Sequence, residues 1–207
     1  MERLAKENFN TAEEYDSIFK ERQLKKTDLF DLKRWKLLAK YFKGGKVIDL
    51  GCLDSLAPFI IKINYPSAEV WGLDQAKETI EFLKNKYPMI TYIQGDVYKT
   101  GFPNEYFNYV VAGELIEHLE EPERFIKEAF RILKPNGILA LSTPLNEKLE
   151  VGAVDKEHHL WSFTTQDIKS LVRLYGSARI KIIGSSYVPK YKYNFPVIIS
   201  WIKKYEN

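Results

Sequence analysis

Four carboxylates follow short apolar runs of the sequence, at positions where a ligand could reach them. They are Asp49, Asp74, Asp96 and Glu114. Asp74 follows Gly51 at about the 20-residue offset of dinucleotide sites, where a carboxylate accepts hydrogen bonds from both hydroxyls of a ribose. Asp96 would lie within reach of an adenine amino group. A single Asp after a strand has a simpler explanation, since Asp favours turns, but the recurrence after successive runs predicts a shared ligand site.

A second group of residues could take up a proton or hold a metal ion. Glu117 and His118 follow Glu114 closely, and His158 and His159 precede LWSFTT. The unperturbed pKa of histidine suits proton transfer, which helps when the nucleophile is a hydroxyl. On a helix, Glu114, Glu117 and His118 would share one face, and a histidine from 158 or 159 would complete an oxygen and nitrogen ligand set for a divalent cation. We predict no metal and keep Glu114, Glu117, His118 and His158 as the alternative; more simply, Glu117 caps a turn and His118 packs against a ligand or bonds a loop.

Along the segments that must position these residues, the spacing of apolar residues alternates between that of strands and that of helices. Residues 11–43 have mostly helical spacing and end at Gly44-Gly45, which stops a helix. We expect strands at 45–53, 69–74, 90–94, 108–113 and 137–142, separated by helical stretches. This alternation predicts right-handed crossovers and a mainly parallel sheet with helices on both faces. Ligands bind such a sheet outside the carboxyl ends of its strands, which is where the carboxylates fall.

Composition and charge restrict the class of protein. A chain of 207 residues with 45% apolar content can bury a sizeable core, and we expect one domain, with a helical cap at 1–44, a cofactor-binding core at 45–175 and C-terminal strands at 176–207. The 31 basic and 28 acidic residues leave a net charge of +3, which does not by itself indicate nucleic-acid binding. The single cysteine fits a reducing compartment. With neither a leader nor an apolar run of about 18 residues, we expect a cytoplasmic protein without stable membrane insertion.

Five segments, taken in order, resemble a known family. They are VIDLGC, VWGLD, IQGDV, FNYVVAGELIEHLEEPERFIKEAFRILKPNGILALSTP and HHLWSFTTQDIKSLV. Together they are similar, over residues 45–175, to the class I S-adenosylmethionine-dependent methyltransferases, and within these to a subgroup with Glu-x-x-Glu-His-Leu after the fourth strand. The resemblance implies an enzyme with S-adenosyl-L-methionine as cofactor and a Rossmann-like, doubly wound α/β fold with a mainly parallel seven-stranded sheet. A nicotinamide cofactor is less consistent, because the loop lacks the second and third glycines of Gly-x-Gly-x-x-Gly.

The resemblance also implies roles for individual residues. Catalytic roles fall on Glu117, His118 and His159. Cofactor contacts are expected at the strand ends and in the N-terminal segment EEYDSIF, namely from Tyr15, Asp49, Gly51, Cys52, Asp74, Gln75, Asp96, Val97, Gly113 and Glu114.

These roles predict methylation, at oxygen, of a small-molecule, lipid-like or saccharide acceptor. One alternative is metal-assisted methylation of an RNA 3′-terminal ribose, which the Glu/Glu/His/His set with STP and Asn146 resembles; against it, residues 144–162 lack the dense arginines that RNA phosphates favour. The other is an inactive methyltransferase-like binding protein. The tail, in which aromatics alternate with lysines, is predicted to form a final strand or packed helix rather than a base-stacking or membrane surface.

One stretch departs from the family pattern. The family usually has Gly-Cys-Gly-x-Gly where this chain has Gly51-Cys52-Leu53-Asp54-Ser55. Gly51, expected nearest the methionine part of the cofactor, is kept, while Leu53 and Ser55 replace glycines that permit positive φ or close backbone approach. We expect an altered but working cofactor loop, in which Leu53 points away from the ligand or packs beneath it.

Overall fold

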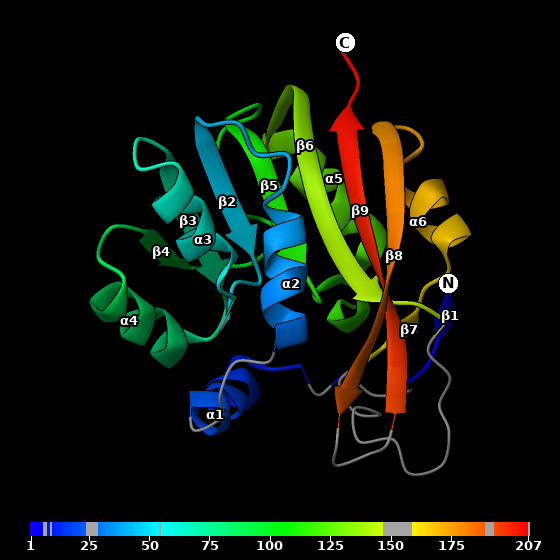
Figure 1. The fold of residues 1–207 in the computed structure, drawn as a ribbon, viewed down its shortest axis with the longest axis horizontal. Helices are drawn as coiled ribbons and strands as arrows, with labels where there is room; N and C mark the ends of the chain where they lie inside the picture. The colour runs from blue at the N-terminus through cyan, green and yellow to red at the C-terminus, as the bar shows by residue number, and fades with distance from the viewer. Residues whose placement is uncertain are drawn as a thin grey trace.

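A seven-stranded sheet runs through the molecule in the order β4-β3-β2-β5-β6-β9-β8 (Figure 1). The computed structural model describes residues 1–5, 8, 10–23, 29–53, 55–146, 159–188 and 193–206. The strands of the sheet are β2 Lys46–Leu50, β3 Glu69–Asp74, β4 Thr91–Gln94, β5 Phe107–Gly113, β6 Leu133–Pro144, β8 Gly176–Val188 and β9 Tyr193–Lys204. The strands β2 to β6 pair in parallel, whereas β9 pairs antiparallel with both β6 and β8. The Rossmann-like fold predicted from the sequence is therefore confirmed.

Helices cover both faces of this sheet. They are α1 Ala12–Gln23, α2 Leu29–Leu38, α3 Ala57–Asn64, α4 Lys77–Lys86, η1 Ile116–His118 (a 3₁₀ turn), α5 Pro122–Ile132 and α6 Thr165–Val172. Two separate apolar clusters lie between layers: one joins the sheet to α2, α3 and α4, and the other joins it to α5 and α6. A short ribbon of β1 Glu2–Arg3 and β7 Trp161–Ser162 fastens the start of the chain beside η1.

The two clusters explain why the strands read as apolar runs. In β6, Leu139 and Leu141 belong to the cluster under α5, and Ala140 between them belongs to the other. Because successive strand residues point to opposite faces, a strand covered on both sides needs apolar residues at every position. In α5, Phe125 and Ala129 stand one turn apart and are both buried, as a helix with a single apolar face requires.

Some boundaries differ from the sequence prediction. The strand expected at 45–53 ends at Leu50, because the chain turns at Gly51 with a φ of 69°. The first 44 residues, expected to form a helical cap, hold two described helices and also the strand β1. The strand expected at 137–142 is longer, since β6 runs from Leu133 to Pro144 along β9. The tail, expected to form a final strand or a packed helix, forms the strand β9, which pairs antiparallel with β6 and β8.

The carboxyl ends of the parallel strands meet at one edge of the sheet, the lower edge in Figure 1, and α1 lies beneath it. The strand order reverses between β2 and β5, since β3 and β4 continue to one side and β6 to the other. Ligands of doubly wound sheets bind at such a switch point. Among the described helices, none combines the length and the apolar character needed to cross a membrane.

Candidate active site

The loop after β2 is tied to the neighbouring strand β3. The amides of Gly51 and Cys52 donate to the carbonyl of Leu73 at 2.8 and 3.2 Å, and the amide of Leu53 donates to Asp74 Oδ2 at 2.9 Å. Leu53 has a φ of 21°, so it keeps a left-handed backbone without being glycine, at some cost in strain. The side chain of Cys52 is fully buried, which leaves its backbone as the part that could face a ligand. Residues 51–53 thus form a turn that hydrogen bonds hold against the end of β3.

Asp49, at the end of β2, is a buried carboxyl group at the floor of this loop. It is 2% exposed, and its Oδ2 has no hydrogen-bond partner among the described residues. Burial raises the pKa of Asp49 to about 7; the Ser55 hydroxyl opposes the shift, the Asp74 carboxylate adds to it and the Arg34 guanidinium opposes it. A cationic ligand group placed beside this buried carboxyl group would stabilise its ionised form.

Asp74 and Asp96 lie at the next two strand ends. Asp74 Oδ1 accepts from the amide of Ala76 at 3.0 Å, so the same carboxylate holds both the loop and the start of α4. Burial raises the pKa of Asp74, against the amides that donate to it. Asp96 follows β4, is exposed, and accepts from the amide of Tyr98 at 2.8 Å; Val97 beside it is half-buried against the core. The sequence-predicted carboxylates therefore share one edge of the sheet.

Glu114 does not share a helical face with Glu117 and His118, so that expectation was wrong. Glu114 has a left-handed φ of 51°, and only Ile116–His118 form a 3₁₀ turn. Its amide donates to the carbonyl of Ser142, and its carboxylate accepts from Ser142 Oγ at 2.8 Å and pairs with Arg34 Nη1 at 3.2 Å. These contacts turn the side chain toward β6 and α2. Gly113 before it ends β5, where an added Cβ would lie 3.0 Å from Leu38.

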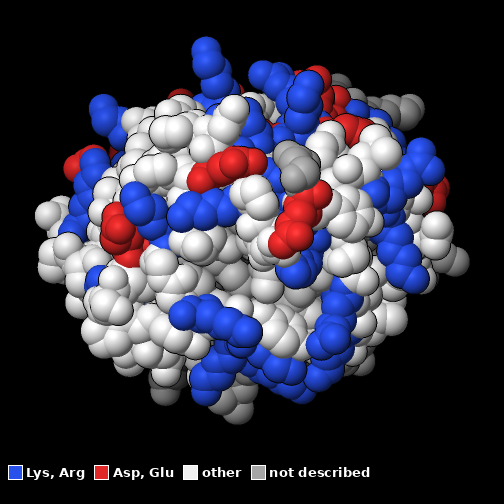
Figure 2. Space-filling view, turned by 90° about the horizontal axis from the view of Figure 1, so that it is seen from above, with Lys and Arg blue, Asp and Glu red and all other residues white. Residues whose placement is uncertain are grey.

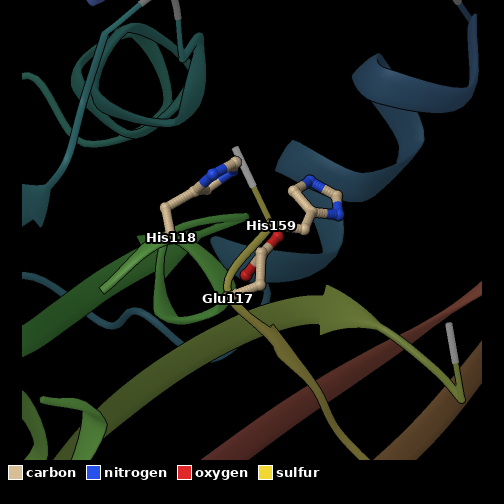
Figure 3. A group of neighbouring side chains, drawn as sticks. All are labelled: Glu117, His118 and His159. Atoms are coloured by element: carbon tan, nitrogen blue, oxygen red, sulfur yellow. The ribbon is translucent and has the colours of Figure 1, made fainter. Parts of the chain in front are cut away.

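Glu117, His118 and His159 do converge, from two segments of the chain (Figure 3). One carboxylate oxygen and one nitrogen of each imidazole all lie within 4.8 Å of one another. Glu117 is fully buried, and the two imidazole rings meet edge to face with centroids 4.6 Å apart. The amide of Leu160 donates to the carbonyl of Glu117 at 2.7 Å, which fixes the two segments together. The remaining candidate, His158, lies outside the described residues.

The N-terminal segment crosses this site. The Tyr15 hydroxyl donates to Asn10 Oδ1 at 2.8 Å, and Asn10 Nδ2 donates to the carbonyl of His118 at 3.0 Å. The Tyr15 ring stands edge-on to His118 at 6.0 Å, and Gln75, after β3, donates from Nε2 to the carbonyl of Asn10 at 3.3 Å. Tyr15 and Gln75 were predicted site residues; Asn10 was not, because it lies outside any periodic segment. Asn10 thus links the Asp74 side of the site to the His118 side.

Asp16 of α1 caps a different helix, α4. The residue at the N-cap of α4, Ala76, has no capping side chain. Asp16 supplies one from outside, accepting from the amides of Glu78 and Thr79 at 3.1 and 2.7 Å and from Thr79 Oγ1 at 2.8 Å. The cap therefore couples the N-terminal helix to the helix that follows Asp74.

We expect Asp16→Ala to lower the free energy of unfolding by about 1–2 kcal/mol, the usual value of an N-cap. Chemical denaturation of the purified protein measures this value. Asp16→Asn should retain most of the stability, because its amide oxygen can still accept, and Ser17→Ala, at an exposed neighbouring position, serves as the matched control. Equal stability of Asp16→Ala and Ser17→Ala would contradict the capping role.

The assembled edge suits a ligand with hydroxyl groups at one end and positive charge at the other. The backbone at Gly51 packs directly against Leu115, since an added Cβ there would lie 2.7 Å from Leu115 Cδ1. Asp49 offers a buried oxygen without a described partner. Carboxylates at the following strand ends can accept from hydroxyl or amino groups.

Comparison with known proteins adds to this geometry. Residues 48–141 match a family model described as a methyltransferase domain. The chain is 29% identical over 110 residues to a probable S-adenosylmethionine-dependent methyltransferase of Mycolicibacterium smegmatis, over 53% of this chain and 42% of that protein. It is 28% identical over 163 residues to the demethylmenaquinone methyltransferase of Chlorobaculum tepidum, over 78% of this chain and 64% of that one. The chain therefore spans less than two thirds of the length of each of these relatives.

A solved structure extends the likeness to most of the fold. It is that of an S-adenosylmethionine-dependent methyltransferase of Thermotoga maritima, described as a possible histamine N-methyltransferase. The two superpose with a TM-score of 0.68 at 16% identity, over 93% of this chain and 95% of that one. At this identity the likeness is one of fold.

Proposed function

The chain belongs to the class I S-adenosylmethionine-dependent methyltransferases, and from this premise we propose that it methylates an oxygen atom of a small-molecule acceptor, lipid-like or saccharide in character. The observation that carries the proposal is the convergence of Glu117, His118 and His159 beside the cofactor edge of the sheet. A relative named for demethylmenaquinone, a lipid-like quinone, supports the acceptor class.

The residues of the edge fit the cofactor. S-adenosylmethionine carries a methyl group on a positively charged sulfur and supplies it to a nucleophile when bound. The Asp49 oxygen that has no partner among the described residues matches the positively charged end, and Asp74 and Asp96 match the nucleoside. The protein then has to align the acceptor and exclude water, a task that the Asn10 and Tyr15 contacts across the site favour.

Glu117, His118 and His159 are placed to remove a proton from the acceptor. A hydroxyl becomes a better nucleophile as its proton moves to a base within hydrogen-bond reach. We assign this role to the imidazole of His159, against which the His118 ring packs edge to face. The buried carboxylate of Glu117 stabilises the imidazolium that results, because opposite charges interact strongly where water is excluded.

A second candidate function is metal-assisted methylation, as at an RNA 3′-terminal ribose. The spacing of the same three side chains favours it, since two histidines and a carboxylate form a common divalent-metal set. Glu114, expected as a fourth ligand, is engaged by Ser142 and Arg34 instead. Figure 2 shows the end of the molecule opposite the site, where Lys and Arg side chains form a run free of Asp and Glu in the lower half of the view. Basic charge at that end does not indicate an RNA interface at the site.

Cofactor affinity should rise with pH through about 7, which tests the cofactor site. The Asp49 carboxyl group, with a pKa raised to about 7, is protonated in much of the free protein at pH 6. A positively charged ligand beside it favours the ionised form, so binding must release that proton below pH 7. We expect S-adenosylmethionine to bind about tenfold more tightly at pH 8 than at pH 6 by titration calorimetry.

Two variants make this measurement specific. The side chain of Asp49→Asn cannot ionise, so this variant should bind S-adenosylmethionine weakly at both pH values, without the tenfold difference. Glu69→Gln is the control: Glu69 is exposed and lies at the end of β3 away from Asp74, so its affinity should equal that of the parent protein at each pH. A tenfold pH dependence that survives in Asp49→Asn would remove Asp49 from the site. Binding weaker than millimolar at both pH values in the parent protein would leave an inactive methyltransferase-like protein.

A further inference from the structure

A group of basic side chains lies on one face of the molecule, over α2 and the last strands of the sheet. This basic face consists of Lys33, Lys36, Lys40, Arg179 and Lys181, and all five residues are exposed. The three lysines follow one another at spacings of three and four, so they share the outer side of α2 and of the turn after it. Arg179 and Lys181 of β8 pair with Trp201 and Ile199 of β9, which belong to the apolar cluster under α2. Both parts of the basic face therefore lie on the same side of the sheet.

Tyr41 and Trp201 join the two parts of the basic face. Arg179 Nη1 donates to the Tyr41 hydroxyl at 3.2 Å, and Lys40 Nζ lies 5.1 Å from the centre of the Tyr41 ring and 5.9 Å from that of Trp201. The hydrogen bond from Arg179 lowers the pKa of Tyr41; burial opposes this shift and the charge of Lys40 adds to it. Trp201 is buried and Tyr41 half-buried, so little of either ring is open for a nucleic-acid base to stack on.

The elements that carry the basic face contain almost no acidic residues. Asp31, the one acidic residue of α2, is held by Arg34 at 2.8 Å. Residues 32–48 and 168–205 contain no Asp or Glu. In Figure 2 the run of Lys and Arg side chains free of Asp and Glu lies on the side that faces the viewer in Figure 1, where α2 crosses in front of the sheet. This concentration of positive charge attracts a partner that carries many negative charges.

Apolar side chains lie among the lysines of the basic face. A hollow beside α2 is lined by Leu32 and Leu37 together with Lys33 and Lys36. An amphiphile with an anionic head and an apolar chain matches both parts of this surface, whereas the backbone of a nucleic acid has no apolar group to place against the leucines. Four of the five basic residues are lysines, which lack the planar fork that makes arginine suited to specific phosphate recognition. These features favour a lipid surface over a nucleic acid.

We propose that the basic face binds the surface of a bilayer that contains anionic phospholipids. A cluster of about four to eight Lys or Arg is attracted to such a surface, and each basic residue strengthens binding about fivefold. The lysines contact the anionic head groups, and Leu32 and Leu37 contact the apolar part of the lipid beneath them. The attachment is peripheral and reversible. The inference goes beyond the proposed function, since it concerns the surface that holds the enzyme and not the molecule that it methylates.

The test is co-sedimentation of the whole protein with vesicles of phosphatidylcholine that contain about one third phosphatidylglycerol, at about 0.1 M salt. The parent protein should bind these vesicles and not those of phosphatidylcholine alone. Binding should be lost at about 1 M salt, where charges are screened beyond about 3 Å. A variant that combines Lys33→Gln, Lys36→Gln and Lys40→Gln should bind the anionic vesicles about a hundredfold more weakly, because it lacks three of the five cationic charges.

The matched control changes the net charge equally on the opposite face of the sheet. It combines Lys127→Gln of α5, Lys169→Gln of α6 and Arg173→Gln, which follows α6; all three residues are exposed. This variant should bind the anionic vesicles as the parent protein does. Chemical denaturation with the parent midpoint shows that both variants are folded.

Three outcomes would overturn the proposal. The first is a parent protein that does not bind the anionic vesicles, and the second is an equal loss of binding in the two triple variants. The third is a parent protein that binds single-stranded RNA more tightly than the vesicles and loses this binding through the three substitutions on α2, which would identify a nucleic-acid surface. The vesicles contain no methyl acceptor, so none of these results bears on the proposed methyl transfer.

Discussion

Gly51→Val is expected to weaken cofactor binding about a hundredfold or more. Gly51 has a φ of 69°, which a β-branched residue adopts only at a cost of about 1–2 kcal/mol or more. An added Cβ would also lie 2.7 Å from Leu115 Cδ1, and the further methyl groups of valine need room in the same place. Leu115 is a flexible side chain and can move, but the backbone strain remains, so the loop must change its path at the point where the cofactor should approach. Titration calorimetry with S-adenosylhomocysteine measures the loss.

Leu53→Gly is the matched change in the same loop. Leu53 has a φ of 21°, so glycine relieves strain there, while the greater freedom of glycine in the unfolded chain offsets the gain in stability. We expect its cofactor affinity to equal or exceed that of the parent protein. Parent affinity in Gly51→Val would mean that the loop is only a turn and that the cofactor lies elsewhere. Activity that emerges only in Leu53→Gly would identify a decayed loop.

The fold could be predicted because its signals are local. Strand β3 contributes to the apolar clusters on both faces of the sheet, and the runs of β3 and β4 end at residues that turn the chain, so the limits of both strands fall within a residue of those expected at 69–74 and 90–94. Gly51 was recognised for the same reason, since glycine is the residue type that most readily adopts a left-handed φ. The residues at the carboxyl ends follow from topology once the sheet is parallel.

What could not be predicted depends on contacts between distant segments. Nothing near Asp16 indicates that it caps α4, because its partners lie some 60 residues away. Arg34 reads as one more basic residue of a lysine-rich helix, and only its burial beside Glu114 distinguishes it. Glu114 was expected on a helix, but its hydrogen bonds to Ser142 hold it outside one. The spacing of apolar residues along the sequence does not reveal such contacts between distant segments.

His159→Ala and Glu117→Gln are expected to lower turnover about 10²- to 10⁴-fold, the usual contribution of general acid–base catalysis, while S-adenosylhomocysteine affinity stays within about twofold of the parent value. His159 would remove the proton from the acceptor hydroxyl, and Glu117, fully buried, would stabilise the imidazolium; Gln keeps the shape of Glu117 without its charge. Turnover is measured as release of S-adenosylhomocysteine with a panel of hydroquinones, catechols and saccharides. Glu123→Gln, exposed on α5, is the matched control.

A chelator then separates the two chemistries that the same side chains could support. If they act only as bases, turnover of the parent enzyme is the same before and after dialysis against EDTA. If they hold a divalent ion, turnover is lost on dialysis and returns with Mn²⁺, Zn²⁺ or Mg²⁺, and His159→Ala and Glu117→Gln both lose metal binding. Turnover near the parent value in both variants would contradict either role, because a cluster needed for proton removal or for metal binding cannot lose His159 or the charge of Glu117 without effect. The site would then act by alignment alone, with an acceptor acidic enough to ionise unaided.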